Sequence, residues 1–373
     1  MAVLNGVPVH TDCVYFRGDV PCRPNKESGY MCGDCPVYTK TGNRILIIKL
    51  GAIGDVIRTT PLLRRIRQEY PNAKITWLTN TPEVLPKKEI EEILRFNLAS
   101  TIYLQNTSFD VLFNLDKDKE ACALHDTIHA NKKFGYTLRT GVPFPSNPMA
   151  YHKYLTGVFD QVSLSNTCSY VEEIFEISGW EFAGEEYVFD THEDKGFTWD
   201  LDRSKQIIGL NTGCGDRKTT RLWSDEKWID LIGRLQEKGY AVVLLGGKLE
   251  DARNSSLSQK TGAIYFGYFP LEQFINLLFQ MDLIVTQVTM AMHIAIALQK
   301  KLVLMNNIFN PHEFHLYNRG HIVQPDKACA CFYQGTCRYG TSCMEDLPAA
   351  KVMAFVEAAI EEREPVYERP IPL

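Results

Sequence analysis

A glycine turn in the first third of the chain carries a carboxylate in an unexpected position. The segment RILIIKLGAIGDVIRTTP, residues 44–61, contains an apolar strand, a turn with Gly51 and Gly54, and a helix. Turns of this shape bind phosphate groups through backbone N–H groups, and a carboxylate repels such a ligand. Asp55 follows the two glycines directly, so it either caps the helix, as aspartate often does, or serves another chemistry.

A loop in the second half of the chain has the groups that bind a diphosphate. The segment LNTGCGDRKTTRLW, residues 210–223, follows a predicted strand and combines glycines, hydroxyls and cations. Close backbone approach and positive charge favour phosphate oxygens. The alternative is a solvated basic loop. The candidate binding residues are Thr212, Gly213, Gly215, Arg217, Lys218, Thr219, Thr220 and Arg221.

Two further loops extend this candidate site. Glu250 begins a predicted helix after the strand YAVVLLGG, where a carboxylate can hold ribose hydroxyls or simply stabilise the helix dipole. Thr289 lies at the start of another predicted helix, where N–H groups point at an anion. His293, one turn later, can donate to the same phosphate, although a histidine among Met, Ala and Ile is more often a core residue.

Eight of the 11 cysteines form two groups. The N-terminus lacks a secretory signal, so we expect a reducing compartment, in which clustered cysteines predict metal ligands before disulfides. Four thiolates can hold zinc, iron or an iron–sulfur cluster, and unligated thiols are the alternative. Whether there is one site or two stays open. The groups are Cys13, Cys22, Cys32 and Cys35, with His10 nearby, and Cys329, Cys331, Cys337 and Cys343.

A weaker metal candidate lies between these groups. Cys122, His125 and His129 fall on one predicted helix, with the histidines four residues apart on one face. These histidines can equally line a ligand pocket.

Alternating strands and helices must position these residues. The alternation begins at residue 44 and restarts at residue 206, which predicts an α/β fold of two Rossmann-like, doubly wound domains facing a cleft. Ligands bind at the carboxyl ends of the strands in such folds. The predicted parts are a Cys-rich, metal-stapled extension at 1–43, domains at 44–195 and 206–345, and a C-terminal helix and tail at 346–373.

Individual segments of the first domain also have predictions. We expect one helix over residues 55–70, kinked at Pro61, and a short helical region over residues 83–96. Residues 101–105 are predicted as a strand, and residues 141–170 as irregular and proline-rich.

The composition excludes several classes of protein. A net charge of −5 argues against a nucleic-acid binder, and 45% hydrophobic with 23% charged residues is typical of globular proteins. The sequence has no run of about 18 apolar residues, so we expect no membrane-spanning helix and a cytoplasmic location.

Four motifs, in their order and spacing, resemble the heptosyltransferase family (glycosyltransferase family nine). They are LGAIGDVIRTTPLLRRIRQEYP, NTG with KTTRLWSDEKWIDLIGRL, VVLLGGKLEDAR and VTQVTMAMHIAIALQKKLV. The resemblance implies a GT-B fold and inverting transfer of heptose from ADP-heptose onto growing lipopolysaccharide. It also implies peripheral association with the inner membrane.

The resemblance assigns roles to single residues. Asp55 occupies the place of the proposed general base in the acceptor domain, and a positioned base contributes about 10²–10⁴-fold. Arg221 stands where members commonly have a lysine. The implied contacts to the donor's diphosphate and ribose are Thr219, Thr220, Arg221, Glu250, Thr289 and His293.

One motif departs from the family. Members usually have Asp-Thr-Gly where this chain has Val288, Thr289 and Met290, so a carboxylate that contacts the donor sugar is missing. The expected donor is therefore a nucleoside-diphosphate sugar, ADP-linked by resemblance, with the sugar left open. The expected acceptor is a glycan, lipid or protein hydroxyl.

Two other functions compete with glycosyl transfer. An inactive nucleotide-sugar-binding or metal-sensing protein agrees with Val288 and Met290. A dinucleotide oxidoreductase shares the fold, but neither glycine loop has the G-x-G-x-x-G pattern. For the transferase, cationic groups stabilise the leaving diphosphate, so no catalytic metal is expected.

Overall fold

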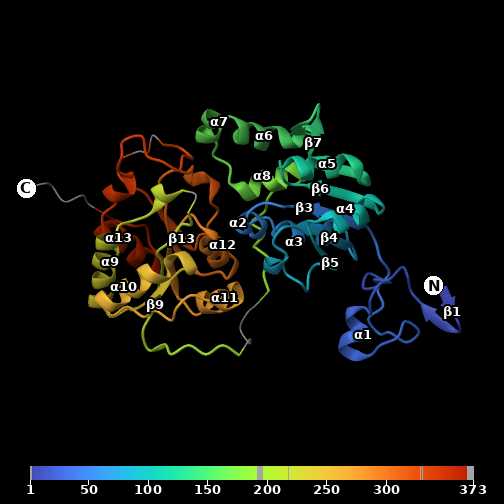
Figure 1. Ribbon diagram of the computed structural model, residues 1–373, viewed down its shortest axis with the longest axis horizontal. Coiled ribbons are helices and arrows are strands. Elements are labelled where there is room, and N and C mark those ends of the chain that lie inside the picture. The colour runs from blue at the N-terminus through green and yellow to red at the C-terminus, as the bar shows by residue number, and fades with distance from the viewer. Residues whose placement is uncertain (1, 191–195, 217, 328, 330, 368–373) are drawn as a thin grey trace, which may run out of the picture. The chain divides into compact units, whose positions relative to one another are not determined.

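The computed structural model describes residues 2–190, 196–216, 218–327, 329 and 331–367 (Figure 1). The chain separates into two compact units. The first unit comprises Met1–Phe159 and Val171–Asp190, and the second comprises Asp160–Tyr170 and Thr191–Leu373. In the described part of the chain, no helix combines the length and apolarity needed to cross a bilayer.

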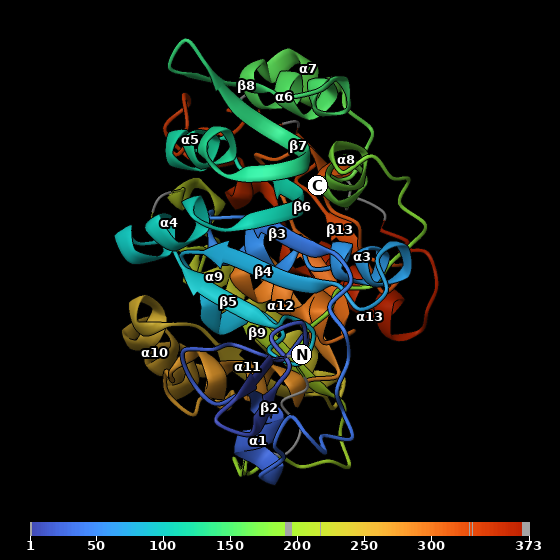
Figure 2. The ribbon, with the colours of Figure 1, turned by 90° about the vertical axis from the view of Figure 1, so that its right-hand side faces the viewer.

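The first unit contains a six-stranded sheet of order β5-β4-β3-β6-β7-β8, seen strand above strand in Figure 2. Neighbouring strands are parallel except for the β7–β8 hairpin. Residues 45–48 are fully buried, which explains their continuous apolar run. The strands are β3 Arg44–Ile48, β4 Lys74–Thr79, β5 Glu92–Arg95, β6 Ser108–Asn114, β7 His129–Arg139 and β8 Val142–Pro145.

Helices connect and cover this sheet. Leu104 and Leu124, from two of the helices, pack in one cluster with Leu46 and Leu112 of the strands. The helices are α2 Ile53–Ile57, α3 Leu62–Glu69, α4 Leu98–Gln105, α5 Lys119–Thr127, α6 Tyr151–Val158 and α8 Tyr170–Ile177, with 3₁₀ helices η1 Pro82–Val84 and η2 Pro148–Ala150.

Four predictions for the first unit are wrong. Residues 55–70 form two helices, α2 and α3, because Pro61 cannot continue a helix and becomes the N-cap of α3. Residues 83–96 contain only the end of the 3₁₀ helix η1 and then strand β5, which pairs with β4. The expected strand at 101–105 belongs to α4, whose N-cap Asn97 accepts the Ser100 N–H at 2.9 Å. Residues 141–170 contain β8, α6 and, in the second unit, α7 Asp160–Ser165.

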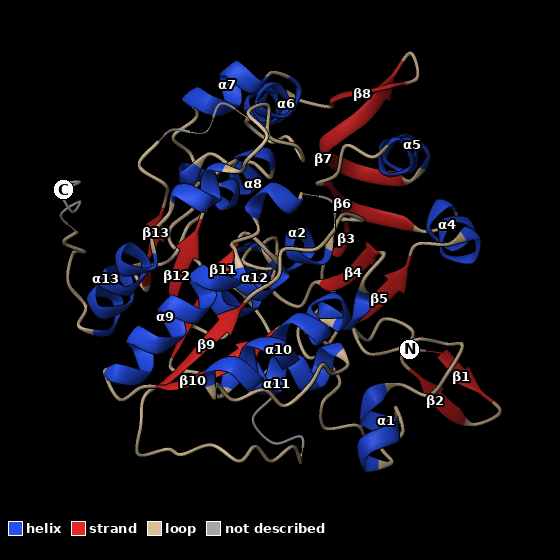
Figure 3. Ribbon diagram, turned by 60° about the vertical axis from the view of Figure 1, so that its left-hand side comes forward, coloured by secondary structure: helices blue, strands red, loops and turns tan. Residues whose placement is uncertain are grey.

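The second unit contains a five-stranded parallel sheet of order β10-β9-β11-β12-β13 (Figure 3). Its core includes Trp223 and Trp228, which pack edge to face with ring centroids 5.0 Å apart. The strands are β9 Ile207–Asn211, β10 Ala241–Leu245, β11 Leu283–Gln287, β12 Lys301–Met305 and β13 Gly320–Val323.

Helices follow most strands of this sheet, as the alternation predicted. The helices are α9 Asp225–Glu237, α10 Asp251–Thr261, α11 Leu271–Phe279, α12 Met290–Ala297 and α13 Ala349–Ile360, with 3₁₀ helices η3 Thr219–Arg221, η4 Lys248–Glu250, η5 Pro311–Glu313 and η6 Cys343–Asp346.

The N-terminal segment has little regular structure. It contains the hairpin β1 Ala2–Leu4 and β2 Val7–Val9 and the short helix α1 Arg23–Ser28. Among the described residues 2–43, Val14 and Pro24 are the only buried ones.

Candidate functional site

The strand order of the second sheet brings three loops together at one edge. The chain runs from β9 to β10 on one side and returns to β11 on the other, so the order reverses between β9 and β11. Ligands of open parallel sheets bind at such a point, beyond the carboxyl ends of the strands. A cavity of about 450 Å³ lies here and is lined by the loops after β9, β10 and β11.

Five of the predicted donor residues line this cavity: Gly213, Gly215, Arg221, Glu250 and Thr289. A Cβ atom at Gly213 would lie 2.1 Å from Glu250 Oε1, so a side chain here would displace the Glu250 carboxylate from its place. Thr289 is the N-cap of α12, and its Oγ1 lies 3.1 Å from Thr286 Oγ1. The backbone N–H groups that begin α12 are therefore positioned for an anion.

Glu250 has a structural role as well as a place in the cavity wall. Its Oε2 accepts the Gly247 N–H at 2.9 Å, which closes the turn η4 like a capping box. The other oxygen faces the space beside Gly213. The helix-terminal role considered from the sequence is thus present, and the carboxylate still lines the cavity.

Arg221 ties two of the loops together. Its guanidinium donates to the backbone oxygens of Cys214, at 2.5 Å, and of Val288. The side chain is buried, and burial lowers its pKa. These bonds hold a positive charge at the cavity and connect the loop after β9 to the start of α12.

The remaining predicted donor residues make other contacts. Lys218 Nζ lies over the rings of Phe309 and Tyr333, 4.9 and 5.0 Å from their centroids. Thr212 Oγ1 donates to Asn254 Oδ1 at 2.6 Å in the protein interior, and Thr220 Oγ1 donates to Gln334 O at 3.3 Å. Thr219 is exposed, His293 is buried in α12, and Arg217 is outside the described residues.

The cavity also contains residues that sequence reasoning missed. Leu249, with 73% of its surface exposed, and Phe274 give it an apolar wall. Asn211, the last residue of β9, donates to Gly213 O at 3.1 Å and to Thr286 Oγ1 at 3.0 Å. Its place at the end of a predicted strand was the available signal.

The first unit has a different arrangement at the corresponding edge of its sheet. The N–H groups of Leu50 and Gly51 both donate to Asp116 Oδ2, each at 2.7 Å. Lys49 Nζ donates to Asp116 Oδ1 at 3.2 Å, with side-chain exposures of 5% and 13%. The carboxylate of Asp116 therefore occupies the N–H groups that would bind a phosphate in a nucleotide-binding turn.

Asp55 lies next to this turn, in the first turn of α2. The N-cap of α2 is Ala52, and Asp55 Oδ1 forms an ion pair with Arg58 Nη2 at 2.7 Å. The Asp55 side chain is 36% exposed. Gly54 lies within α2, and its carbonyl accepts the Arg58 N–H at 3.0 Å.

Cations surround the same edge of the first sheet. Lys117 follows Asp116, and burial together with Lys153 and Lys49 lowers its pKa to about 8. Lys153 forms an ion pair with buried Glu173 at 2.6 Å.

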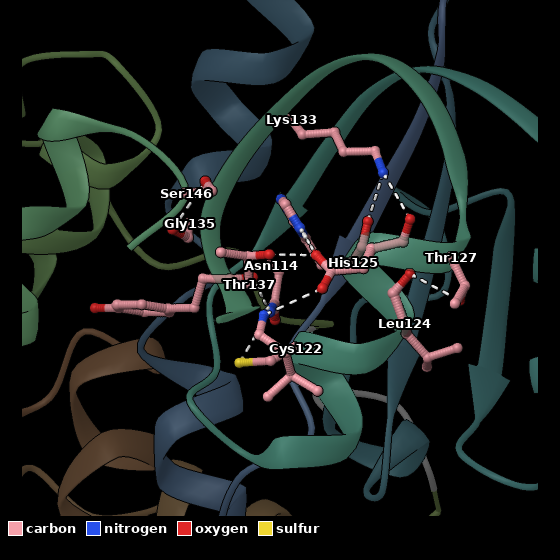
Figure 4. Close-up of polar contacts among 12 residues, drawn as sticks. Asn114, Cys122, Leu124, His125, Thr127, Lys133, Gly135, Thr137 and Ser146 are labelled. Carbon is pink, nitrogen blue, oxygen red and sulfur yellow. Dashed lines mark hydrogen bonds and ion pairs between the residues drawn. The ribbon is translucent and has the colours of Figure 1, made fainter. Parts of the chain in front are cut away.

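The weaker metal candidate does not form on one helix face. Cys122 and His125 are buried in α5, but His129 begins strand β7, because the helix ends at Thr127. Figure 4 shows Cys122, His125 and Thr127 on this helix. Asn114 Nδ2 lies 3.8 Å from Cys122 Sγ, and Lys133 Nζ donates to His125 O at 2.6 Å. These contacts fasten α5 to β6 and β7.

The two predicted cysteine groups each gather locally. The four N-terminal cysteines line one small cavity. In the C-terminal group, Cys331 Sγ lies 3.9 Å from Cys337 Sγ, and Asn307 Nδ2 donates to Cys343 Sγ at 3.5 Å. Among the described residues, no three His, Cys, Asp or Glu side chains lie in an arrangement that could hold a metal ion.

Comparison with known proteins identifies the relatives of this chain. A family model described as glycosyltransferase family 9 (heptosyltransferase) matches residues 99–336. The lipopolysaccharide core heptosyltransferase OpsX of Haemophilus influenzae is 26% identical over 111 residues. That match covers 27% of this chain and 32%, about a third, of the curated relative's length.

Solved structures share the fold at low sequence identity. A family 9 glycosyl transferase from Veillonella parvula has a TM-score of 0.63 at 18% identity, covering 86% of this chain and 97% of that chain. E. coli heptosyltransferase WaaC with ADP has a TM-score of 0.61 at 16% sequence identity, and the match covers 85% of this chain and 99% of that chain. The iron-containing dodecameric glycosyltransferase TibC of E. coli has a TM-score of 0.52 at 12% sequence identity, and the match covers 86% of this chain and 77% of that chain. These similarities confirm the predicted GT-B fold class.

Proposed function

Because the chain belongs to glycosyltransferase family 9, we propose that it transfers heptose or a related sugar from a nucleoside-diphosphate sugar to a hydroxyl group. The observation that carries this proposal is the 450 Å³ cavity at the point where the strand order of the second sheet reverses. Its volume suits a nucleotide-sized ligand. E. coli WaaC was solved with ADP, which supports an ADP-linked donor.

The cavity supplies each part of such a donor with a partner. The N-terminus of α12, at Thr289, and the fixed charge of Arg221 are suited to the diphosphate. Glu250 is suited to the ribose hydroxyls, and Leu249 to the base. Fixed N–H groups and a cation stabilise charge on the leaving diphosphate, so no catalytic metal is needed in this proposal.

Asp55 is the proposed general base of an inverting transfer. The acceptor oxygen attacks the anomeric carbon, the bond to the diphosphate breaks, and the hydroxyl proton passes to the carboxylate. Asp116 supports this division of roles, since its carboxylate fills the turn beside Asp55 and disfavours a phosphate there. Part-exposed Asp55 remains accessible to an acceptor.

The test separates transfer from donor binding. Asp55→Asn should lower the transfer rate by about 10²–10⁴-fold, while calorimetry with the donor shows an unchanged Kd. Glu69→Gln is the matched control, because Glu69 also pairs with an arginine on a helix of the first unit, at 3.0 Å. Equal loss of transfer and donor affinity in Asp55→Asn would reject the base assignment.

The donor and acceptor need separate experiments. Val288 and Met290 line the cavity without a charge, so the sugar itself is left open. Thermal stabilisation by ADP-, GDP-, UDP- and CDP-sugars should single out the ADP compounds, and a donor at 100 times its Kd should add about 2.7 kcal/mol. A lipid-linked glycan acceptor, suggested by the name of OpsX, predicts peripheral membrane association in cell fractionation.

We also propose structural zinc or iron at the C-terminal cysteine group. Three of the cysteines precede η6 and Cys343 begins it, and the N–H groups of Cys331 and Arg338 donate to the sulfur atoms of Cys329 and Cys331, each at 3.3 Å. TibC is an iron-containing relative in fold, which agrees with this proposal. Metal analysis of a Cys337→Ser/Cys343→Ser variant should show lost metal, and an unchanged content would reject the site.

A further inference from the structure

The four N-terminal cysteines lie around one cavity that is too small for an organic ligand. Its volume is about 20 Å³, close to that of a single water-sized sphere. None of the four cysteines is in a disulfide, and the rest of the lining consists of His10, three tyrosines and the apolar Phe16, Pro24 and Met31. A space of this size bordered by four thiols matches one metal ion.

Local backbone turns bring these distant cysteines to the same place. Cys13 donates its N–H to His10 O at 3.1 Å and pairs with Lys40 in an isolated bridge. Cys22 is the N-cap of α1. Cys35 O accepts the Tyr38 N–H at 3.2 Å, which forms a turn after the Cys-x2-Cys pair.

The segment that holds these cysteines has no core of its own. Only Val14 and Pro24 are buried among the described residues 2–43, and Met31 is 56% exposed. One contact with the sheet is the polar bond from Lys74 Nζ of β4 to Phe16 O, at 2.8 Å. A short segment without a core needs cross-links or a metal to stay folded.

We propose that Cys13, Cys22, Cys32 and Cys35 bind one tetrahedral zinc or ferrous ion and that this ion holds residues 10–41 in their fold. Four thiols release four protons and form four metal–sulfur bonds, of about 2.3 Å for zinc. Among the described residues no three His, Cys, Asp or Glu side chains already form a closed set of ligands, so metal binding requires the thiols to turn towards the cavity. His10 also lines this cavity, with its ring 4.3 Å from that of Tyr38 between centroids, and the four sulfurs are the ligand set of this proposal.

The first experiment compares the metal content of purified full-length variants. Cys32→Ser/Cys35→Ser should lose about one metal equivalent relative to wild type. Cys168→Ser is the matched control, because Cys168 belongs to neither cysteine group, and it should lose none. Cys337→Ser/Cys343→Ser should keep this equivalent. Elemental analysis distinguishes zinc from iron, and equal metal in Cys32→Ser/Cys35→Ser and wild type would overturn the proposal.

The second experiment uses the wild-type protein, so a misfolded variant cannot confuse it. The four N-terminal thiols should resist alkylation until a chelator is added, as read by peptide mass spectrometry. The chelator should also expose protease cleavage within residues 10–41 while residues 44–190 stay intact. Rapid alkylation of all four thiols without chelator, or their recovery as disulfides, would refute the metal site.

Discussion

Removal of the largely buried Asp116 carboxylate should weaken the centre of the first unit. Asp116 accepts two backbone N–H bonds at 2.7 Å from the turn after β3 and pairs with Lys49, whose side chain is 5% exposed. Breaking a buried ion pair from one side costs about 3–5 kcal/mol, and each charge-assisted bond contributes about 1.5–3 kcal/mol. These contributions overlap, so we expect Asp116→Ala to cost about 4 kcal/mol.

Hydrogen exchange measured by mass spectrometry can locate this loss. The free energy of opening should fall in peptides of β3 and β6, and peptides of β9 in the second unit should keep theirs. Asp110→Ala is the control, because Asp110 accepts one backbone N–H of β3, from Arg44 at 2.7 Å at the other end of the strand, together with the exposed side-chain amide of Asn131 at 3.3 Å. Its expected cost is about 1 kcal/mol.

Lys49 provides the decisive comparison. In Lys49→Met/Asp116→Ala the buried ammonium is also gone, so the double variant should recover part of the stability lost in Asp116→Ala. A loss below about 1 kcal/mol in Asp116→Ala, or no coupling to Lys49, would refute the view that the carboxylate neutralises this site.

Three more experiments test other parts of the structure. Lys117→Met should stabilise the first unit by about 2–3 kcal/mol at pH 7, because burial lowers the Lys117 pKa to about 8. The free-energy cost of burying the charged Lys117 amine is fully present below pH 8 and disappears towards pH 10.5, where the amine of the unfolded chain also releases its proton. Urea titrations at several pH values should therefore show the stability difference between Lys117→Met and wild type shrinking as the pH rises. Gly213→Ala should weaken donor binding in calorimetry, because the new Cβ displaces Glu250, whereas Gly233→Ala, with no atoms within 4 Å, should not. Cys122 should resist iodoacetamide in native protein, because burial raises its pKa to about 12, and rapid labelling seen by mass spectrometry would contradict that.

Much of the fold was accessible from local pattern. The continuous apolar strand at 44–48 and the amphipathic helix α9 were identifiable because burial on one or both faces imposes a period. Segments with weak periodicity were misassigned. Strand β5 forms because it pairs with β4, and helix α4 begins where Asn97 caps it. Neither strand pairing nor helix capping produces a periodic pattern of apolar residues that could be detected in the sequence.

The sequence by itself determined the residue types at the ends of the strands, and through them the loops that line the donor cavity. It also determined which thiols are available for a metal. Only the tertiary structure decided that Glu250 contacts Gly213, that Arg221 binds backbone oxygens and that Lys218 lies over aromatic rings. The reason is physical: periodicity reports which face of an element is buried, whereas the direction of a loop side chain depends on partners from other strands. Asp116 shows this most clearly, since 65 residues of sequence separate it from the Gly51 N–H that it accepts.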